Sequence, residues 1–135
     1  MIVVDTNLIA YLYLQGEYTT HAEQVLQRDS AWAVPLLWRS EFRNVLAFYL
    51  RQNLLSLKDA EDIMEKAEAF LLGREYEVSS THVLRLANAS QCSAYDCEFV
   101  SLAQELGVPL VTADRKVLKA FPQVAMTPSA FATSR

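Results

Sequence analysis

The hydrophobic positions of this chain fall into short apolar runs separated by longer stretches with helical spacing. The runs lie at residues 2–4, 30–34 and 109–112, with shorter candidates at 75–78 and 124–126. An apolar run that does not alternate with polar residues is typical of a strand buried on both faces of a sheet. These segments are therefore predicted to be strands.

The stretches between the runs carry apolar residues at the three- and four-residue spacing of amphipathic helices. Ser56 with Asp59, and Ser93 with Asp96, have the spacing of a capping box, and Gly73 is expected to end a helix. The predicted helices lie at 7–14, 19–28, 35–52, 57–72, 80–90, 93–106 and 114–121. The last nine residues, 127–135, are expected to be a loose tail.

Strands thus alternate with helices from one end of the chain to the other. This order predicts an α/β fold, with a parallel sheet covered by helices on both faces. The chain has 135 residues, so we expect a single domain over residues 1–135.

Acidic side chains fall at positions that such a sheet would bring together. Asp5 ends the first strand, and Asp114 lies just past the strand at 109–112. Asp96 opens the helix that leads into that strand, and Glu41 lies in a helix otherwise rich in Leu, Trp, Phe and Val. Because ligand sites in open α/β sheets form at the carboxyl ends of strands, these acids are expected to converge there.

Each acid also has a structural explanation when it is taken alone. Asp5 could stabilise a turn, Asp96 could complete a capping box, and Asp114 could cap the last helix. Glu41 is harder to explain, because a carboxylate beside an apolar stripe is costly to bury unpaired. Arg43 is two residues away and points to a different face of the helix, although an arginine elsewhere could pair with Glu41.

Carboxylates gathered by a fold repel one another. At ~5 Å and an effective dielectric constant of ~20, each pair of like charges costs about 3 kcal/mol. A hard divalent cation offsets this cost, and oxygen-only ligands select Mg²⁺ or Mn²⁺. The chemistry indicated is metal-assisted attack of water on a phosphodiester.

Composition narrows the alternatives. Apolar residues make up 52% of the chain, as in globular proteins, and the net charge of −4 is a weak argument against non-specific binding to nucleic acid. The sequence contains no apolar run of ~18 residues, no signal peptide, no Gly-rich phosphate loop and no Gly-x-Ser-x-Gly elbow. The two cysteines suggest small reduced residues, so a soluble protein of the cytoplasm is expected, with no contact to a membrane.

Basic residues flank two of the acids. Arg115 and Lys116 follow Asp114 directly, and Arg39 and Arg43 flank Glu41. They can be solvated helix faces, or they can contact phosphate groups beside a metal ion.

The ordered motifs resemble those of the PIN-domain ribonucleases, and among them the VapC-type toxins of bacterial toxin–antitoxin pairs. The opening IVVDTN at 2–7 resembles the first strand of that family with its Asp-Thr pair. The sequence SAYD at 93–96 and LVTAD at 110–114 resemble its third and fourth acidic motifs, and Glu41, six residues after Pro35, resembles its second acid. The similarity spans essentially the whole chain.

The resemblance implies a three-layer α/β/α fold with four or five parallel strands, and Mg²⁺- or Mn²⁺-dependent endonucleolytic cleavage of RNA. It further implies a homodimer blocked by an antitoxin protein, for which the leucine-rich helix at 35–52 offers a surface. The implied metal-binding catalytic residues are Asp5, Glu41, Asp96 and Asp114, the supporting residues are Thr6, Asn7 and Thr112, and the candidate RNA contacts are Arg39, Arg43, Arg115 and Lys116.

Two other functions remain open on the sequence alone. A phosphatase with Asp5 as nucleophile would need a second aspartate two residues later, where this chain has Asn7. A binding module that keeps the fold without cutting RNA is the other alternative.

Overall fold

The computed structural model describes residues 1–134, and its centre is a five-stranded parallel sheet of order β3–β2–β1–β4–β5. The strands are β1 (Ile2–Val4), β2 (Trp32–Pro35), β3 (Glu75–Tyr76), β4 (Leu110–Val111) and β5 (Ala125–Met126). In the central strand β1, Val3 pairs with Ala33 of β2 on one side and with Leu110 of β4 on the other. The predicted α/β class with a parallel sheet is confirmed.

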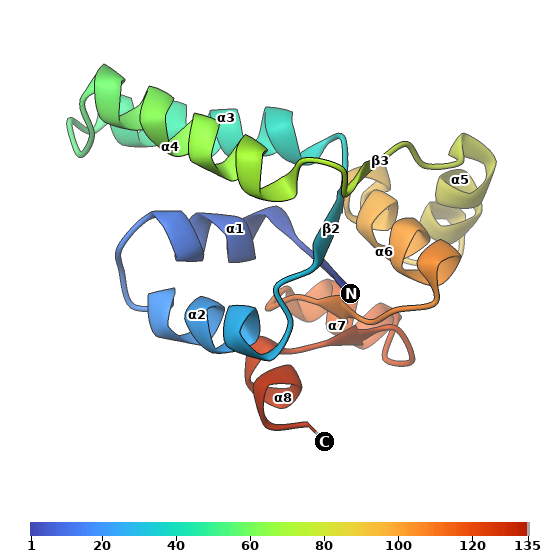
Figure 1. Ribbon diagram of the computed structural model, residues 1–135. Coiled ribbons are helices and arrows are strands. Elements are labelled where there is room, and N and C mark those ends of the chain that lie inside the picture. Colours follow the sequence, from blue (N-terminus) through green and yellow to red (C-terminus); the bar gives the residue numbers. More distant parts are fainter. Residues whose placement is uncertain (135) are drawn as a thin grey trace.

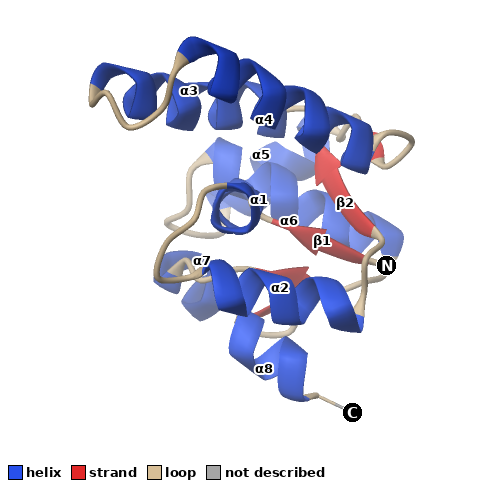
Figure 2. Cartoon of the chain, turned by 60° about the vertical axis from the view of Figure 1, so that its left-hand side comes forward, coloured by secondary structure: helices blue, strands red, loops and turns tan. Residues whose placement is uncertain are grey.

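Helices cover both faces of this sheet (Figures 1 and 2). They are α1 (Thr6–Tyr13), α2 (Thr19–Arg28), α3 (Trp38–Arg51), α4 (Leu57–Leu71), α5 (Ser80–Asn88), α6 (Ala94–Leu106), α7 (Arg115–Ala120) and α8 (Pro128–Thr133). The first four and α8 pack on one face, while α5, α6 and α7 pack on the other. Helices α3 and α4 form an antiparallel pair that projects past the sheet (Figure 2).

The strands contribute to two separate hydrophobic cores. Ile2 and Val4 of β1 face the core under α1–α4, whereas Val3 between them faces the core under α5–α7. Successive side chains of a strand point to opposite faces, so a strand buried on both faces must be apolar at every position. This explains why β1 is an uninterrupted apolar run in the sequence.

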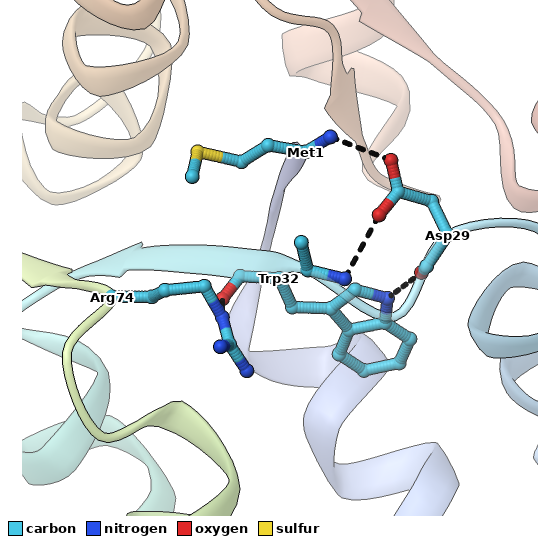
Figure 3. A network of polar contacts seen from close by, with 5 residues as sticks. Met1, Asp29, Trp32 and Arg74 are labelled. Carbon is cyan, nitrogen blue, oxygen red and sulfur yellow. Dashed lines mark hydrogen bonds and ion pairs between the residues drawn. The ribbon is translucent and has the colours of Figure 1, made fainter.

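A polar network fixes the amino ends of β1 and β2 (Figure 3). The terminal ammonium group of Met1 donates to Oδ2 of Asp29 at 2.7 Å, and the backbone N–H of Ala31 donates to Oδ1 of Asp29 at 2.8 Å. The indole of Trp32 donates to the carbonyl of Asp29 at 2.8 Å, and Nε of Arg74 donates to the carbonyl of Trp32 at 2.9 Å. These bonds hold the amino ends of the strands. Asp5 lies at the opposite, carboxyl end of β1.

The structure differs from the sequence prediction at two places. The helix expected over 35–52 begins only at Trp38, because Pro35 still belongs to β2. The prediction of a loose tail is wrong for most of 127–134: Thr127 caps α8 by accepting a hydrogen bond from the N–H of Ala130 at 3.0 Å, and Phe131 is buried. Arg135, the last residue of that tail and of the expected domain, lies outside the described residues.

No helix within residues 1–134 is both long enough and apolar enough to cross a membrane.

Candidate active site

Asp5 lies between β1 and α1, and its carboxylate is fixed by two hydrogen bonds. Oδ1 accepts from the backbone N–H of Leu8 at 3.0 Å, so Asp5 caps α1. Oδ2 accepts from the hydroxyl group of Thr112, at the end of β4. The turn-stabilising role considered for Asp5 is therefore real, and it places the carboxylate at the carboxyl end of the sheet.

Glu41 lies in the first turn of α3, facing α1. Its Oε1 accepts a hydrogen bond from the hydroxyl group of Thr6 at 2.7 Å, and Thr6 itself is buried. The carboxylate is thus oriented by a neighbouring helix. It has no arginine partner among the described residues, since the only hydrogen bond of its side chain is to Thr6.

Asp96 and Asp114 both lie in the first turn or at the cap of a helix. The backbone N–H of Asp96 donates to Oγ of Ser93 at 3.0 Å, which confirms the cap at the start of α6. Oδ1 of Asp114 accepts from the N–H groups of Lys116 and Val117 at 2.9 Å and 3.3 Å, which confirms its cap on α7. The N–H of Asp114 donates to Oγ1 of Thr112 at 3.0 Å, so Thr112 connects Asp114 to Asp5.

The four acids line one cavity of about 260 Å³, named here the acidic cavity. The structure therefore brings the four acids together at the carboxyl ends of β1 and β4, as predicted. The helix-capping roles of these residues are compatible with this arrangement. The other lining residues are Thr6, Asn7, Asn44, Val45, Phe99, Leu110, Thr112 and Val117.

Five of these lining residues were not identified from the sequence: Asn44, Val45, Phe99, Leu110 and Val117. Asn44, Phe99 and Val117 each lie three residues after one of the acids, on helices α3, α6 and α7. Residues three apart share a face of a helix, so this spacing was a signal that could have found them.

Burial and mutual repulsion govern the ionisation of the acids. Burial, with smaller contributions from the charges of Asp114 and Glu41, raises the pKa of Asp5 from 3.8 to about 6, although its hydrogen bonds to Thr112 and Leu8 oppose the rise. Burial and the charge of Asp96 raise the pKa of Glu41, and burial and the charge of Asp114 raise the pKa of Asp96. Each of the four carboxylates therefore repels two of the others: Asp5 and Asp96 each repel Glu41 and Asp114.

The donor atoms of the acidic cavity suit a hard cation. Its described lining supplies carboxylate, hydroxyl and amide oxygens and contains no Lys, Arg or His. Within residues 1–134, however, no three Asp, Glu, His or Cys side chains lie close enough together to enclose an ion as they stand. Since Mg²⁺ commonly takes one or two protein carboxylates and completes its shell with water, the residues fit such an ion without a closed cage.

Comparison with known proteins identifies the family. Residues 2–124 match the PIN domain family. This chain belongs to the PIN domain family. Over 124 residues, this PIN domain is 29% identical to Ribonuclease VapC3 of Pyrobaculum aerophilum, and the match covers 90% of the chain and 95% of that protein. The family resemblance inferred from the motifs is confirmed.

Solved structures share the fold of this PIN domain. PAE2754 from Pyrobaculum aerophilum superposes with a TM-score of 0.76 at 21% identity, covering 97% of this chain and 92% of that one. One chain of a toxin–antitoxin complex from Klebsiella pneumoniae superposes with a TM-score of 0.70 at 18% identity, covering 95% and 98%.

The candidate RNA contacts of the PIN domain lie in different settings. Arg115 and Lys116 are exposed at the start of α7, and the charge of Lys116 opposes the rise in the pKa of Asp96. Arg43 is exposed on α3 but does not line the acidic cavity. Arg39 differs from the expectation, because its guanidinium pairs with both oxygens of Glu75 at 2.6 Å and 2.8 Å, and with Glu68 at 2.7 Å.

Proposed function

We propose that this PIN domain is a metal-dependent endoribonuclease and the toxin of a type II toxin–antitoxin pair. The observation that carries the proposal is the acidic cavity, where four mutually repelling carboxylates face one another without a basic side chain in the described lining. Ribonuclease VapC3, the relative that aligns with 90% of the chain, supports RNA as the substrate.

Asp5, Glu41, Asp96 and Asp114 would hold Mg²⁺ or Mn²⁺ in pairs, with water completing the coordination. When bound, the ion would lower the pKa of a water molecule and neutralise charge on the phosphoryl oxygens. The carboxylate of Asp5 is the most deeply buried of the four, and its two hydrogen bonds fix its orientation. The other three carboxylates would bind the ion on the exposed side of Asp5.

The polar neighbours of the acids have distinct supporting roles in this proposal. Thr112 orients Asp5, and Thr6 orients Glu41, through hydroxyl donors. Asn7 and Asn44 line the acidic cavity and offer amide donors to a phosphate group. Asn7 also stands where an Asp-nucleophile phosphatase would need its second aspartate, which argues against that alternative.

Phosphate groups on either side of the cleaved bond would contact exposed cations. Arg115 and Lys116 lie next to Asp114, so their side chains are placed to attract the RNA backbone. Arg43 could contribute from α3. Arg39 is left out of this set, since Glu75 and Glu68 already use its donors.

The proposal includes a protein partner and a homodimer. Phe48 of α3, Leu54 and Leu57 are exposed large apolar residues on the α3–α4 pair, a surface that an antitoxin or a second copy would cover. The Klebsiella pneumoniae structure with the same fold is a toxin–antitoxin complex, which supports the antitoxin. Cys92 and Cys97 are free and buried, as suits the reducing cytoplasm.

The decisive experiment is cleavage of total RNA by the wild-type protein and Asp5→Asn, each with Mg²⁺ and with EDTA. We expect EDTA to stop cleavage and Asp5→Asn to slow it by about 100-fold or more, because the substitution removes a carboxylate that would hold the ion. Glu61→Gln, which removes an exposed acid of α4, is the matched control and should cleave normally. Cleavage that survives in folded Asp5→Asn would refute the proposal.

A further inference from the structure

Two further cavities lie near the acidic cavity, on the side of α1. The first, of about 340 Å³, shares the lining residues Asn7 and Val45 with the acidic cavity. The second, of about 160 Å³, is lined in part by Ala113, which lies between Thr112 and Asp114 in the chain. The first of these cavities therefore borders the site where the four acids meet, and the second reaches the residue that lies between Thr112 and Asp114 of that site.

Tyr11 and Tyr18 line both of these cavities, so this pair stands between them. Tyr11 belongs to α1, and Tyr18 immediately precedes α2. Their ring centroids are 5.0 Å apart with 39° between the ring planes, and Tyr18 is 47% exposed. His21 continues the series, with its ring 6.1 Å from that of Tyr18.

The helix α1 connects this aromatic pair to the acids. Asp5 caps the helix, Asn7 lies in its first turn, and Tyr11 follows Asn7 by four residues on the same face. The charge of Asp5 adds to the effect of burial in raising the pKa of Tyr11, which agrees with their closeness.

We propose that Tyr11 and Tyr18 form a stacking platform for an unpaired base of the RNA, next to the phosphate that lies in the acidic cavity. This inference rests on the proposed function, since it assigns a binding site to the same substrate. Single-stranded RNA is recognised by bases that stack on aromatic side chains, and every base has a face that can stack.

The charge of the protein gives stacking particular weight. With a net charge of −4, this PIN domain has little electrostatic attraction for RNA in general. Stacking on an aromatic ring adds affinity for each unpaired base and does not depend on positive charge. A base within a duplex keeps both faces covered by its neighbours, so the platform selects unpaired RNA.

The size of the second cavity also favours a base. Its volume is about 160 Å³, and Tyr18, His21 and Pro128 are among the residues that line it. This space suits one planar ring system, whereas a helix of a protein partner needs a groove about 10 Å wide.

The test measures binding separately from cleavage. A labelled single-stranded oligoribonucleotide of mixed sequence and a labelled RNA duplex are titrated with protein carrying Asp5→Asn, and Kd is read from fluorescence anisotropy. We expect the added change Tyr18→Ala to weaken binding of the single strand about 10-fold and to leave duplex binding unchanged. Tyr18→Phe keeps the ring and should keep the affinity.

A matched control separates stacking from the loss of any exposed apolar side chain. Leu72→Ala removes a side chain at the end of α4 that is 74% exposed and lines neither of these cavities, so the affinity for RNA should not change. In protein with Asp5 intact, Tyr18→Ala should raise KM with little effect on kcat, because a platform binds substrate and transition state alike.

The possible results distinguish the platform from the nuclease. Equal single-strand affinity of the Asp5→Asn protein with and without Tyr18→Ala, or no single-strand binding at all, would overturn the platform. Unchanged RNA affinity together with loss of a bound protein partner would also overturn it and assign the tyrosines to that partner. Single-strand binding that depends on Tyr18, found together with no RNA cleavage by the protein with Asp5 intact, would support the platform and refute the nuclease.

Discussion

The hydroxyl group of Thr112 donates a hydrogen bond to Oδ2 of Asp5, although the two residues are 107 positions apart in the chain. Oγ1 of Thr112 also accepts a hydrogen bond from the backbone N–H of Asp114 at 3.0 Å, and Thr112 is only 1% exposed. One buried hydroxyl group therefore sets the relation between the acids that follow the two central strands β1 and β4.

Replacing Thr112 tests this role. Thr112→Val keeps the shape but leaves Oδ2 of Asp5 and the N–H of Asp114 without their partner. We expect RNA cleavage to fall by about 10–100-fold, as for other residues that orient ligands. Because this hydrogen bond lowers the pKa of Asp5, the acidic limb of the pH–rate profile should also move to higher pH. Thr112→Ser should retain most activity, and equal activity of the Val and Ser variants would contradict the prediction.

Asp5→Asn should stabilise the metal-free protein at neutral pH. The pKa of Asp5 is about 6 in the fold against 3.8 when unperturbed, so folding favours the protonated form. That contribution is complete below pH 3.8 and is lost as the pH rises through 6, where the ionised group costs about 2 kcal/mol after allowance for partial exposure.

Urea unfolding in EDTA measures this effect. The Asn variant should be more stable than the wild type at pH 7.5, and the difference should nearly vanish at pH 4. Asparagine also caps helices well, so α1 is not disturbed. A wild type that is the more stable of the two at pH 7.5 would show that the repulsion among the acids is small.

Divalent ions should stabilise the wild-type protein through the acidic cavity. An ion that binds only the folded state adds about 2.7 kcal/mol when its concentration is 100 times Kd. Melting temperatures measured with increasing Mn²⁺ should rise for the wild type, and rise less for Glu41→Gln. KCl of equal ionic strength is the control for general screening, and a wild type that responds equally to both salts would contradict a metal site.

Substitutions of Lys116 and Arg39 should have different effects on the salt dependence of RNA binding. If Lys116 contacts a phosphate group, Lys116→Gln should reduce the slope of log K against log salt concentration by about 0.7, the value for one contact on a single strand. Arg39→Gln should leave that slope unchanged and lower the free energy of unfolding by about 1–2 kcal/mol, because it loses its bonds to Glu75 and Glu68. A slope that falls only with Arg39→Gln would reverse these assignments.

The central fold could be predicted because its signals are local. Strand β1 and the segment before Asp114 are buried on both faces, so their apolar runs stand out in the sequence. Helix α8 was missed because its signal is a single Thr-Pro cap with one large apolar residue, Phe131. Its stability depends on packing against α2, which no local pattern records.

The acids of the site could be predicted for a related reason. The positions of Asp5 and Asp114 follow from where strands end, and parallel strands end at a common edge. The partners of Arg39, in contrast, lie on α4 and β3, and nothing near Arg39 in the sequence indicates them. The pairing of Tyr11 with Tyr18 depends on how the loop after α1 turns back, which is a tertiary property.

The spacing of the acids along the chain has a consequence for biosynthesis. A ribosome adds Asp114, and the strand β4 that positions it, 109 residues after Asp5. If the cavity cuts RNA as proposed, the nascent polypeptide cannot cleave its own messenger until this later segment has been made and has folded against β1.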